Sequence, residues 1–229
     1  MPEERSPGGS TIHRYSTSEW AEPHLAAADD LSMQFGEARE KVYQRLFGKA
    51  ESVYHEVFLL RPHVDVFTHA RSSPQGKVCA LVTGGMSDLP MNVPPAAGKA
   101  APRRVELIFY CSEPKQEYLE TLRWLARFPH DQNAWLSYWH TLPNGNPPAP
   151  VCGSEILDTF LFMPTIVKRD QDLPKQLILA GDPVHFLWVV PISSPECKLK
   201  LEHGFGAIVD LFQRHRHPHV FDPRRKSYV

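Results

Sequence analysis

The first regular pattern of hydrophobic and polar positions along the chain is helical. Phe35, Ala38, Val42 and Leu46 recur at intervals of three or four residues, and charged residues stand between them. This spacing places the apolar side chains on one face of an α-helix. It predicts an amphipathic helix that ends near Gly48, because glycine after the last apolar position favours a helix stop.

A second helical stripe lies in the middle of the chain. Pro114 suits a first helical position, and Tyr118, Leu122 and Leu125 follow at helical spacing. The pattern predicts a helix of about three turns that lies across a sheet.

The last predicted helix carries its own start signal. Ser194 has the residue type of an N-cap, Pro195 suits the first helical position, and Glu196 adds a negative charge to the first turn. Apolar residues then repeat at helical spacing, at Phe205, Ile208, Val209 and Phe212.

Runs rich in β-branched and aromatic residues lie between these helices, and turn-forming residues separate them. The run from Arg103 to Tyr110 is apolar on both faces, which predicts an inner strand. The predicted strands are residues 53–60, 63–70, 77–83, 103–110, 157–163, 175–180 and 184–190.

The order of these elements predicts the fold class. Strands come in consecutive groups and do not alternate with helices, which favours an α+β domain with one mixed, mostly antiparallel sheet and helices packed against it. Residues 1–30 show no period and predict a flexible N-terminal extension, and residues 31–229 predict a single domain.

Charge and composition reduce the number of possible functional classes. With 25 Lys and Arg against 26 Asp and Glu, the chain has no overall positive field, which argues against a nucleic-acid or membrane-surface protein. The stretch from Arg214 to Val229 is locally basic, so nucleic-acid binding stays a minor alternative. Proline, at 22 residues, predicts rigid loops around residues 90–102 and 143–150.

The spacing of the cysteines and the first residues of the chain predict the cellular compartment of the protein. The four cysteines form no C-x-x-C pair, and no apolar run resembles a signal sequence or a membrane span. We therefore expect reduced thiols in a cytoplasmic protein that does not contact a membrane.

Standard catalytic motifs are incomplete in this chain. Ser87 lacks the second glycine of G-x-S-x-G because Leu89 occupies it, and His55 and Glu56 lack the second histidine of H-E-x-x-H. No phosphate-binding loop is present either, so we expect no catalytic residue and no cofactor.

A metal site is the alternative that the residues leave open. On one predicted strand, spacings of two and four place His63, Asp65 and His69 on one face, and His55 with Glu56 would lie on the neighbouring strand. The competing interpretation is a polar strand face in water. A second group, His215, His217 and His219, is interrupted by a proline, and a solvated tail is the simpler interpretation.

An aromatic cluster stands out after the middle helix. Trp135, Tyr138, Trp139 and His140 combine large rings with polar tips, which is typical of interfaces, and the proline-rich surroundings would hold them rigid. The alternative is that these rings cover the sheet as part of the core.

Several segments, in the right order, resemble the suppressor of fused (SUFU) domain family in its bacterial, single-domain form. The stretches that carry the resemblance are VTGGMSDLPM (82–91), RRVELIF (103–109), LRWLARF (122–128), YWHTLPNG (138–145), FLWVVPISSPE (186–196), GFGAIVDLF (204–212) and DPRRKSY (222–228). Each stretch alone is weakly specific, and the resemblance rests on the order and spacing of the stretches.

The resemblance implies a domain without established catalysis. Animal members hold a transcription-factor peptide as an added strand in a cleft between two lobes, of which this chain resembles one. Many bacterial members are proposed to be immunity proteins that bind toxins. Phe128 resembles an aromatic residue of the family's peptide cleft, and Trp139 with His140 resembles a Trp-His pair near it. Trp135 stands where animal members have an acidic anchor.

Our leading hypothesis is a non-enzymatic domain that binds a protein or peptide partner, a toxin or a regulatory protein, through Phe128, Trp135, Tyr138, Trp139 and His140. The rival hypothesis is a metal-dependent enzyme that uses His55, His63, Asp65 and His69. Metal analysis of the purified protein separates the two, because only the rival requires bound Zn, Mn or Fe.

Overall fold

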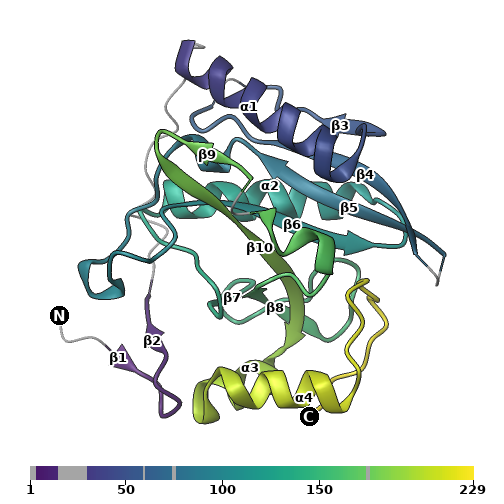
Figure 1. The fold of residues 1–229 in the computed structure, drawn as a ribbon. Helices are drawn as coiled ribbons and strands as arrows, with labels where there is room; N and C mark the ends of the chain where they lie inside the picture. Colours follow the sequence, from purple (N-terminus) through teal and green to yellow (C-terminus); the bar gives the residue numbers. More distant parts are fainter. Residues whose placement is uncertain (1–3, 15–29, 59, 74–75, 174–175) are drawn as a thin grey trace.

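The computed structural model describes residues 4–14, 30–58, 60–73, 76–173 and 176–229, and the fold is α+β, as predicted. One sheet runs through the middle of the molecule with the strand order β3-β4-β5-β6-β10-β8-β7, and β9 pairs with β10 (Figure 1). Its strands are β3 (Ser52–Tyr54), β4 (Asp65–Ser73), β5 (Gly76–Gly84), β6 (Arg104–Cys111), β7 (Thr141–Pro143), β8 (Leu157–Met163), β9 (Ile178–Leu179) and β10 (Asp182–Ser193).

The sheet is mixed and mostly antiparallel. The central strand β6 pairs in parallel with β10, whereas β5 pairs with β6 in the antiparallel sense, and so do the other neighbours in the order. All eight residues of β6 are buried, which confirms the prediction of an inner strand. A strand covered on both faces favours apolar side chains, and six of the eight positions of β6 carry them; Arg104 and Glu106 are the exceptions.

Helices cover both faces of this sheet. They are α1 (Asp30–Phe47), α2 (Gln116–Asp131), α3 (Ser194–His203) and α4 (Phe205–Arg214). Tyr43 of α1 and Ile208 of α4 belong to one apolar cluster, together with Ile108 of β6. Leu122 and Leu125 of α2 belong to the cluster on the opposite face. Alternate residues of the sheet thus point into two separate cores.

Two findings concern the predictions about membrane spans and reduced thiols. None of the helices in the described ranges is long and apolar enough to cross a membrane. Cys79, Cys111, Cys152 and Cys197 are all buried free thiols.

Two predicted strands are shorter than their apolar runs. Among the described residues of the run 53–60, the strand is Ser52–Tyr54, and in the described part of the run 175–180 it is Ile178–Leu179. The chain leaves the sheet after Tyr54, and Val57 and Phe58 are 86% and 70% exposed. Hydrophobic composition alone therefore overestimated the strand, because the exposed apolar residues have no neighbouring strand to pair with.

The helix starts also differ from the prediction. The N-cap of α3 is Ser193, not Ser194: its side chain accepts from the backbone N–H of Glu196, whose carboxylate accepts from the N–H of Ser193. A capping box joins a residue to the glutamate three positions later, and Ser193, unlike Ser194, has that spacing to Glu196. Gly204 then ends α3 and separates it from α4, so the single predicted helix is two. Pro114 precedes α2, which begins at Gln116.

The C-terminal residues pack against the domain, so the interpretation of a solvated tail is wrong. Phe221 contacts Phe109 and Tyr118 through its ring, at centroid distances of 5.2 and 5.7 Å. Arg225 donates two hydrogen bonds to the buried carboxylate of Glu196, at 2.7 and 2.8 Å. Arg225 is thereby tied to a particular acidic partner, whereas the other four basic residues of the predicted positive patch are exposed: Arg214, Arg216, Arg224 and Lys226.

Replacing Arg225 by alanine should destabilise the domain by about 2–3 kcal/mol, because hydrogen bonds to a charged group are lost and the buried Glu196 carboxylate loses its cation. Although burial opposes ionisation, hydrogen bonds from Arg225 hold the pKa of Glu196 below its usual value. Urea unfolding at neutral pH measures the change. Arg224→Ala is the control, since Arg224 is exposed, and an equal loss in both variants would refute the pairing.

Candidate partner-binding surface

The aromatic segment lies between the end of α2 and the start of β7, in irregular backbone as predicted. Trp139 donates its backbone N–H to the carbonyl of Phe162 at 2.6 Å, and Phe162 donates to the carbonyl of His140 at 2.9 Å. These bonds extend the pairing of β7 with β8 back to Trp139. Trp139 has φ of 68°, in the left-handed region. A bulky residue there is unusual and is held by its surroundings.

Trp139 forms an aromatic pair with Phe205, the first residue of α4. The two rings are stacked with centroids 4.9 Å apart and planes 25° apart. Phe205 is 53% exposed, so the pair presents apolar area at the surface. Exposed large rings with a fixed orientation are common anchors in protein interfaces.

The other residues of the segment are fixed by polar contacts at their tips. Trp135 donates its indole N–H to the carbonyl of Pro102 at 3.0 Å and packs edge-on against His140 at 4.7 Å. The Tyr138 hydroxyl lies 3.2 Å from Nδ1 of His185. Burial lowers the pKa of His140 to about 4 and raises that of Tyr138 to about 12. Both groups are therefore uncharged at neutral pH.

The predicted site residues fall on two faces of the sheet. Phe128, Trp135 and Tyr138 pack against the apolar cluster on the α2 side, whereas Trp139 packs against the cluster that contains α1 and α4. The left-handed backbone at Trp139 turns its ring away from those of its neighbours. The residues thus surround one end of the sheet and do not form a single stack.

The edge strand β7 lies directly after these residues. It pairs with β8 on one side, and within the described ranges no strand pairs with its other side. An unpaired edge presents backbone donors and acceptors that an extended peptide can use. Pro143, at the end of β7, lacks a donor and limits the accessible length of the edge.

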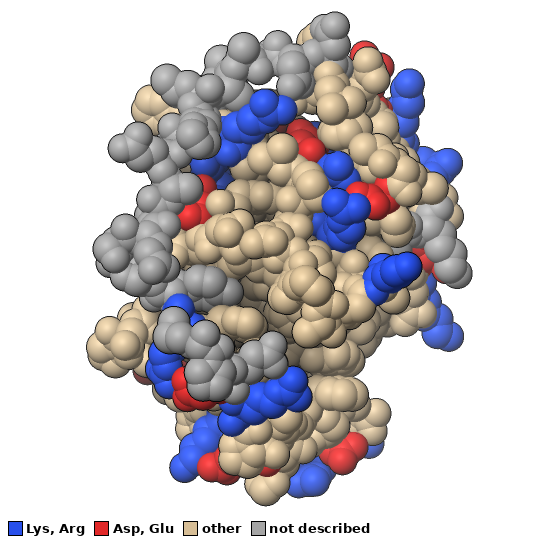
Figure 2. Space-filling model, turned by 90° about the vertical axis from the view of Figure 1, so that its left-hand side faces the viewer, with Lys and Arg blue, Asp and Glu red and all other residues tan. Residues whose placement is uncertain are grey.

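The face next to these elements is mostly uncharged. Figure 2 views the molecule from the side where β1, β2 and the loop before β6 lie, and it shows a shallow hollow of uncharged residues with charged residues of both signs around it. A surface of this kind suits a protein or peptide partner more than a phosphate backbone, because the centre lacks positive charge.

The loop beside Trp135 is anchored by a buried glutamate that sequence reasoning missed. Glu106 of β6 is fully buried, and its carboxylate accepts from the side chains of Thr83 and Ser87 and from the backbone N–H groups of Gly85 and Ser87. These bonds fix the start of the loop that ends at Pro102. The signal in the sequence was a single acidic residue inside the most apolar strand.

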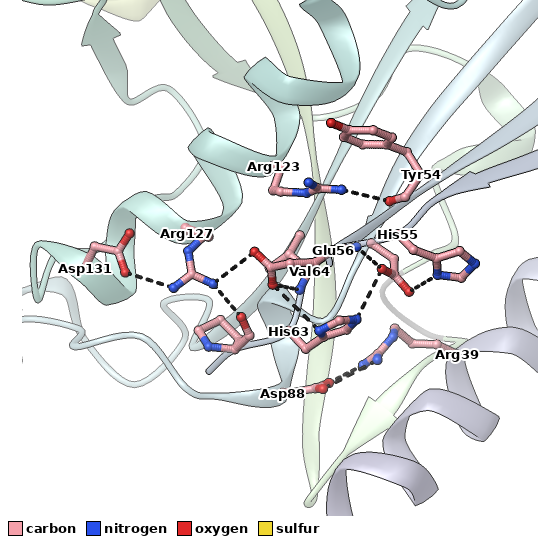
Figure 3. A network of polar contacts seen from close by, with 12 residues as sticks. Arg39, Tyr54, His55, Glu56, His63, Val64, Asp88, Arg123, Arg127 and Asp131 are labelled. Carbon is pink, nitrogen blue, oxygen red and sulfur yellow. Dashed lines mark hydrogen bonds and ion pairs between the residues drawn. The ribbon is translucent and has the colours of Figure 1, made fainter. Parts of the chain in front are cut away.

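The predicted metal ligands His55, His63 and Asp65 lie at the opposite edge of the sheet, where β3 ends and β4 begins. Asp65 accepts from the backbone N–H of Glu56 at 3.0 Å, and its two carboxylate oxygens lie 3.1 Å from His55 and 3.3 Å from His63 (Figure 3). His55, His63 and Asp65 are therefore neighbours, as predicted. His69 is not, because it lies four residues further along β4 and its Nδ1 lies 3.1 Å from the carbonyl of Gly48.

Glu56 is used for structure in this network. Its carboxylate accepts from the backbone N–H of Val64 at 3.0 Å and lies 3.5 Å from Arg127 of α2, which also donates to the carbonyl of Pro62 at 2.8 Å (Figure 3). Among the described residues, no group of three or more His, Cys, Asp or Glu is arranged to hold a metal ion. The structure accounts for this cluster as a link between α2 and the ends of β3 and β4.

The second histidine group is also dispersed. His217 stacks on Phe212 at 4.1 Å, His215 stacks on Tyr228 at 4.5 Å, and His219 packs against Tyr110 at 5.6 Å. His215 and His217 both contact Tyr228, whereas His219 packs against Tyr110, so the three imidazoles are not arranged as one group of ligands.

Comparison with known proteins identifies the family. The family model described as suppressor of fused protein (SUFU) matches residues 61–226. The chain belongs to the suppressor of fused family. No curated protein matches the sequence significantly. The match to the family model confirms the resemblance inferred from the ordered sequence stretches.

Solved structures show the same fold. A structure described as a SUFU homolog from Neisseria gonorrhoeae is similar with a TM-score of 0.64 and 16% identity, over 86% of this chain and 98% of that one. A crystal structure of a Sufu–Fu complex is similar with a TM-score of 0.57 and 12% identity, over 86% of this chain and 91% of that one. At these identities the likeness concerns the SUFU fold and not the residues of a site.

Proposed function

We propose that this SUFU domain is a non-enzymatic protein-binding module with an immunity-like or regulatory role. The observation that carries the proposal is the Trp139–Phe205 pair, in which Phe205 is exposed and Trp139 partly buried, beside an edge of β7 that no described strand pairs with. Two further facts support it. The chain belongs to the SUFU family, and one of the solved structures with a similar fold is that of a Sufu–Fu complex. A partner would add backbone hydrogen bonds at β7 and bury the two rings.

The geometry also supports the absence of catalysis in this proposal. Ser87 donates its hydroxyl to Glu106 and is fully buried, so it has no access to a substrate. The His55, His63 and Asp65 group holds loop and helix together, and His69 lies elsewhere. No observation favours the metal-dependent enzyme as a second function.

The proposal is tested by measuring how Trp139→Ala changes the affinity for a partner. The partner is first captured with the wild-type chain, identified and purified, and its binding is then measured by calorimetry. We expect a 30- to 100-fold loss of affinity, because a central aromatic anchor contributes about 2–3 kcal/mol.

The matched control is Phe58→Ala. Phe58 is 70% exposed, and it lies at the opposite edge of the sheet, after β3. It should leave the affinity unchanged. Equal affinity of Trp139→Ala and the wild type, with both folded by circular dichroism, would refute the proposed surface.

A further inference from the structure

The N-terminal residues cover part of the candidate surface. β1 (Glu4–Arg5) and β2 (Thr11–Ile12) pair as a small hairpin, which lies beside α3 (Figure 1). At its turn, Gly8 donates its backbone N–H to the carbonyl of Leu201 at 2.7 Å. The hairpin therefore satisfies one of the free carbonyls at the C-terminal end of α3.

The turn fits closely against the junction of α3 and α4. A Cβ atom added at Gly8 would lie 2.4 Å from the backbone nitrogen of Gly204 and 2.8 Å from the carbonyl oxygen of Leu201. Only glycine allows this approach. Gly204 directly precedes Phe205, the ring that stacks on Trp139, so the hairpin reaches the border of the aromatic pair.

Beneath the hairpin lies the buried lysine Lys200. Lys200 of α3 is only 4% exposed, and its ammonium group donates to the hydroxyl of Ser10 at 3.3 Å. Within the described ranges no carboxylate forms an ion pair with it. A buried ammonium with one neutral acceptor is costly, because buried charges are normally paired and an ammonium group has three donors to satisfy.

Lys200 also lies next to the candidate surface. Besides burial, the charges of Lys200 and His13 contribute to the lowered pKa of His140, so both residues are close to it. Burial also lowers the pKa of Lys200 itself, as expected for an uncompensated cation. Along the chain, Lys200 lies four residues before Gly204 and five before Phe205, the ring that stacks on Trp139.

The hairpin is a short element. Its strands are two residues long, and the ion pair between Glu4 and Arg14 is largely exposed and contributes little. A competing segment that brings a carboxylate to Lys200 would replace the neutral Ser10 hydroxyl by a stronger, charge-assisted bond.

From these contacts we propose that the end of α3 under the hairpin is a docking site for an extended acidic segment of a protein partner. The segment displaces the hairpin and pairs one carboxylate with Lys200. The inference rests on the proposed partner-binding function and specifies the chemistry of the partner. It also makes the hairpin an internal competitor, since a tethered segment acts at high effective concentration.

The test uses a labelled synthetic peptide with the sequence of residues 4–14 and the change Ser10→Asp. Its binding is measured by fluorescence anisotropy to the full-length chain and to the full-length Gly8→Ala variant, in which the clash at Gly204 releases the hairpin. We expect at least tenfold tighter binding to Gly8→Ala. Equal binding to both proteins, or no binding to Gly8→Ala, would overturn the proposal. Gly36→Ala, where the added Cβ meets nothing, is the control.

The role of Lys200 is tested in the Gly8→Ala background. Lys200→Met should weaken binding of the Ser10→Asp peptide about tenfold, which corresponds to about 1.4 kcal/mol, and Lys198→Met on the exposed side of α3 should not. An unchanged affinity in Lys200→Met would overturn the proposal.

A second measurement uses full-length chains with an intact Gly8. Ser10→Asp should slow hydrogen exchange of the Gly8 amide about tenfold, and this gain should vanish in Ser10→Asp/Lys200→Met; a gain that survives loss of Lys200 contradicts the proposal. These experiments need no natural partner, so their failure is distinguishable from a failure of the Trp139→Ala test.

Discussion

Glu106→Ala should destabilise the domain by about 3–5 kcal/mol, the largest loss that we expect from a single side chain. The carboxylate of Glu106 accepts from the side chains of Thr83 and Ser87 and from two backbone N–H groups. Alanine leaves all these buried donors unsatisfied, and each unsatisfied donor costs about 1–3 kcal/mol before relaxation. Urea unfolding monitored by tryptophan fluorescence measures the loss.

Two further variants test whether the loss of stability comes from the buried carboxylate of Glu106. Burial raises the pKa of Glu106, and the charge of Arg39 together with hydrogen bonds from Ser87 and Thr83 opposes that rise. Glu106→Gln keeps one acceptor and should cost less than Glu106→Ala. Glu113→Ala, at an exposed position, should change stability by less than about 0.5 kcal/mol. A loss below about 1 kcal/mol for Glu106→Ala would contradict the anchoring role of this residue.

The domain should lose roughly 3 kcal/mol of stability between pH 7 and pH 5. Burial lowers the pKa of four histidines to about 4: His69, His130, His140 and His217. In the unfolded chain these groups titrate near pH 6.5, so there they bind protons that the folded protein does not. Their contribution is complete above pH 6.5 and is lost as the pH falls towards 4.

The magnitude and origin of this acid sensitivity can be checked together. Each histidine contributes at most about 1.4 kcal/mol per pH unit, and we discount this limit because three of the four are partly exposed. His69→Phe should flatten the dependence, since it removes a titrating group whose Nε2 has no hydrogen-bond partner. His55→Gln, at an exposed position, should not. A melting temperature that is constant from pH 7 to pH 5 would contradict the account.

Much of the fold could be predicted because its signals are local. Apolar spacing identified α1 and α2, and the run 157–163 coincides with β8. Predictions failed where the decisive contact is distant in sequence. The run 53–60 looks like a strand, but at Glu56 the chain turns to reach Val64 and Arg127.

The candidate site was only partly predictable for the same reason. The aromatic residue types of the segment 135–140 were visible in the sequence, but its division over two sheet faces depends on the left-handed backbone at Trp139. Phe205 was assigned to a helix core, and only the structure shows that it is exposed and stacked on Trp139. Lys200 gave no signal, since nothing in its neighbourhood along the chain indicates burial beside Ser10.

The most direct test of the central claim is hydrogen exchange of the wild-type chain with and without its purified partner. The account predicts that protection on binding is concentrated in residues 139–143, which include the β7 edge, and at the α3–α4 junction around Gly204. Protection confined to the opposite edge, around His55 and Asp65, with residues 139–143 unchanged, would contradict it.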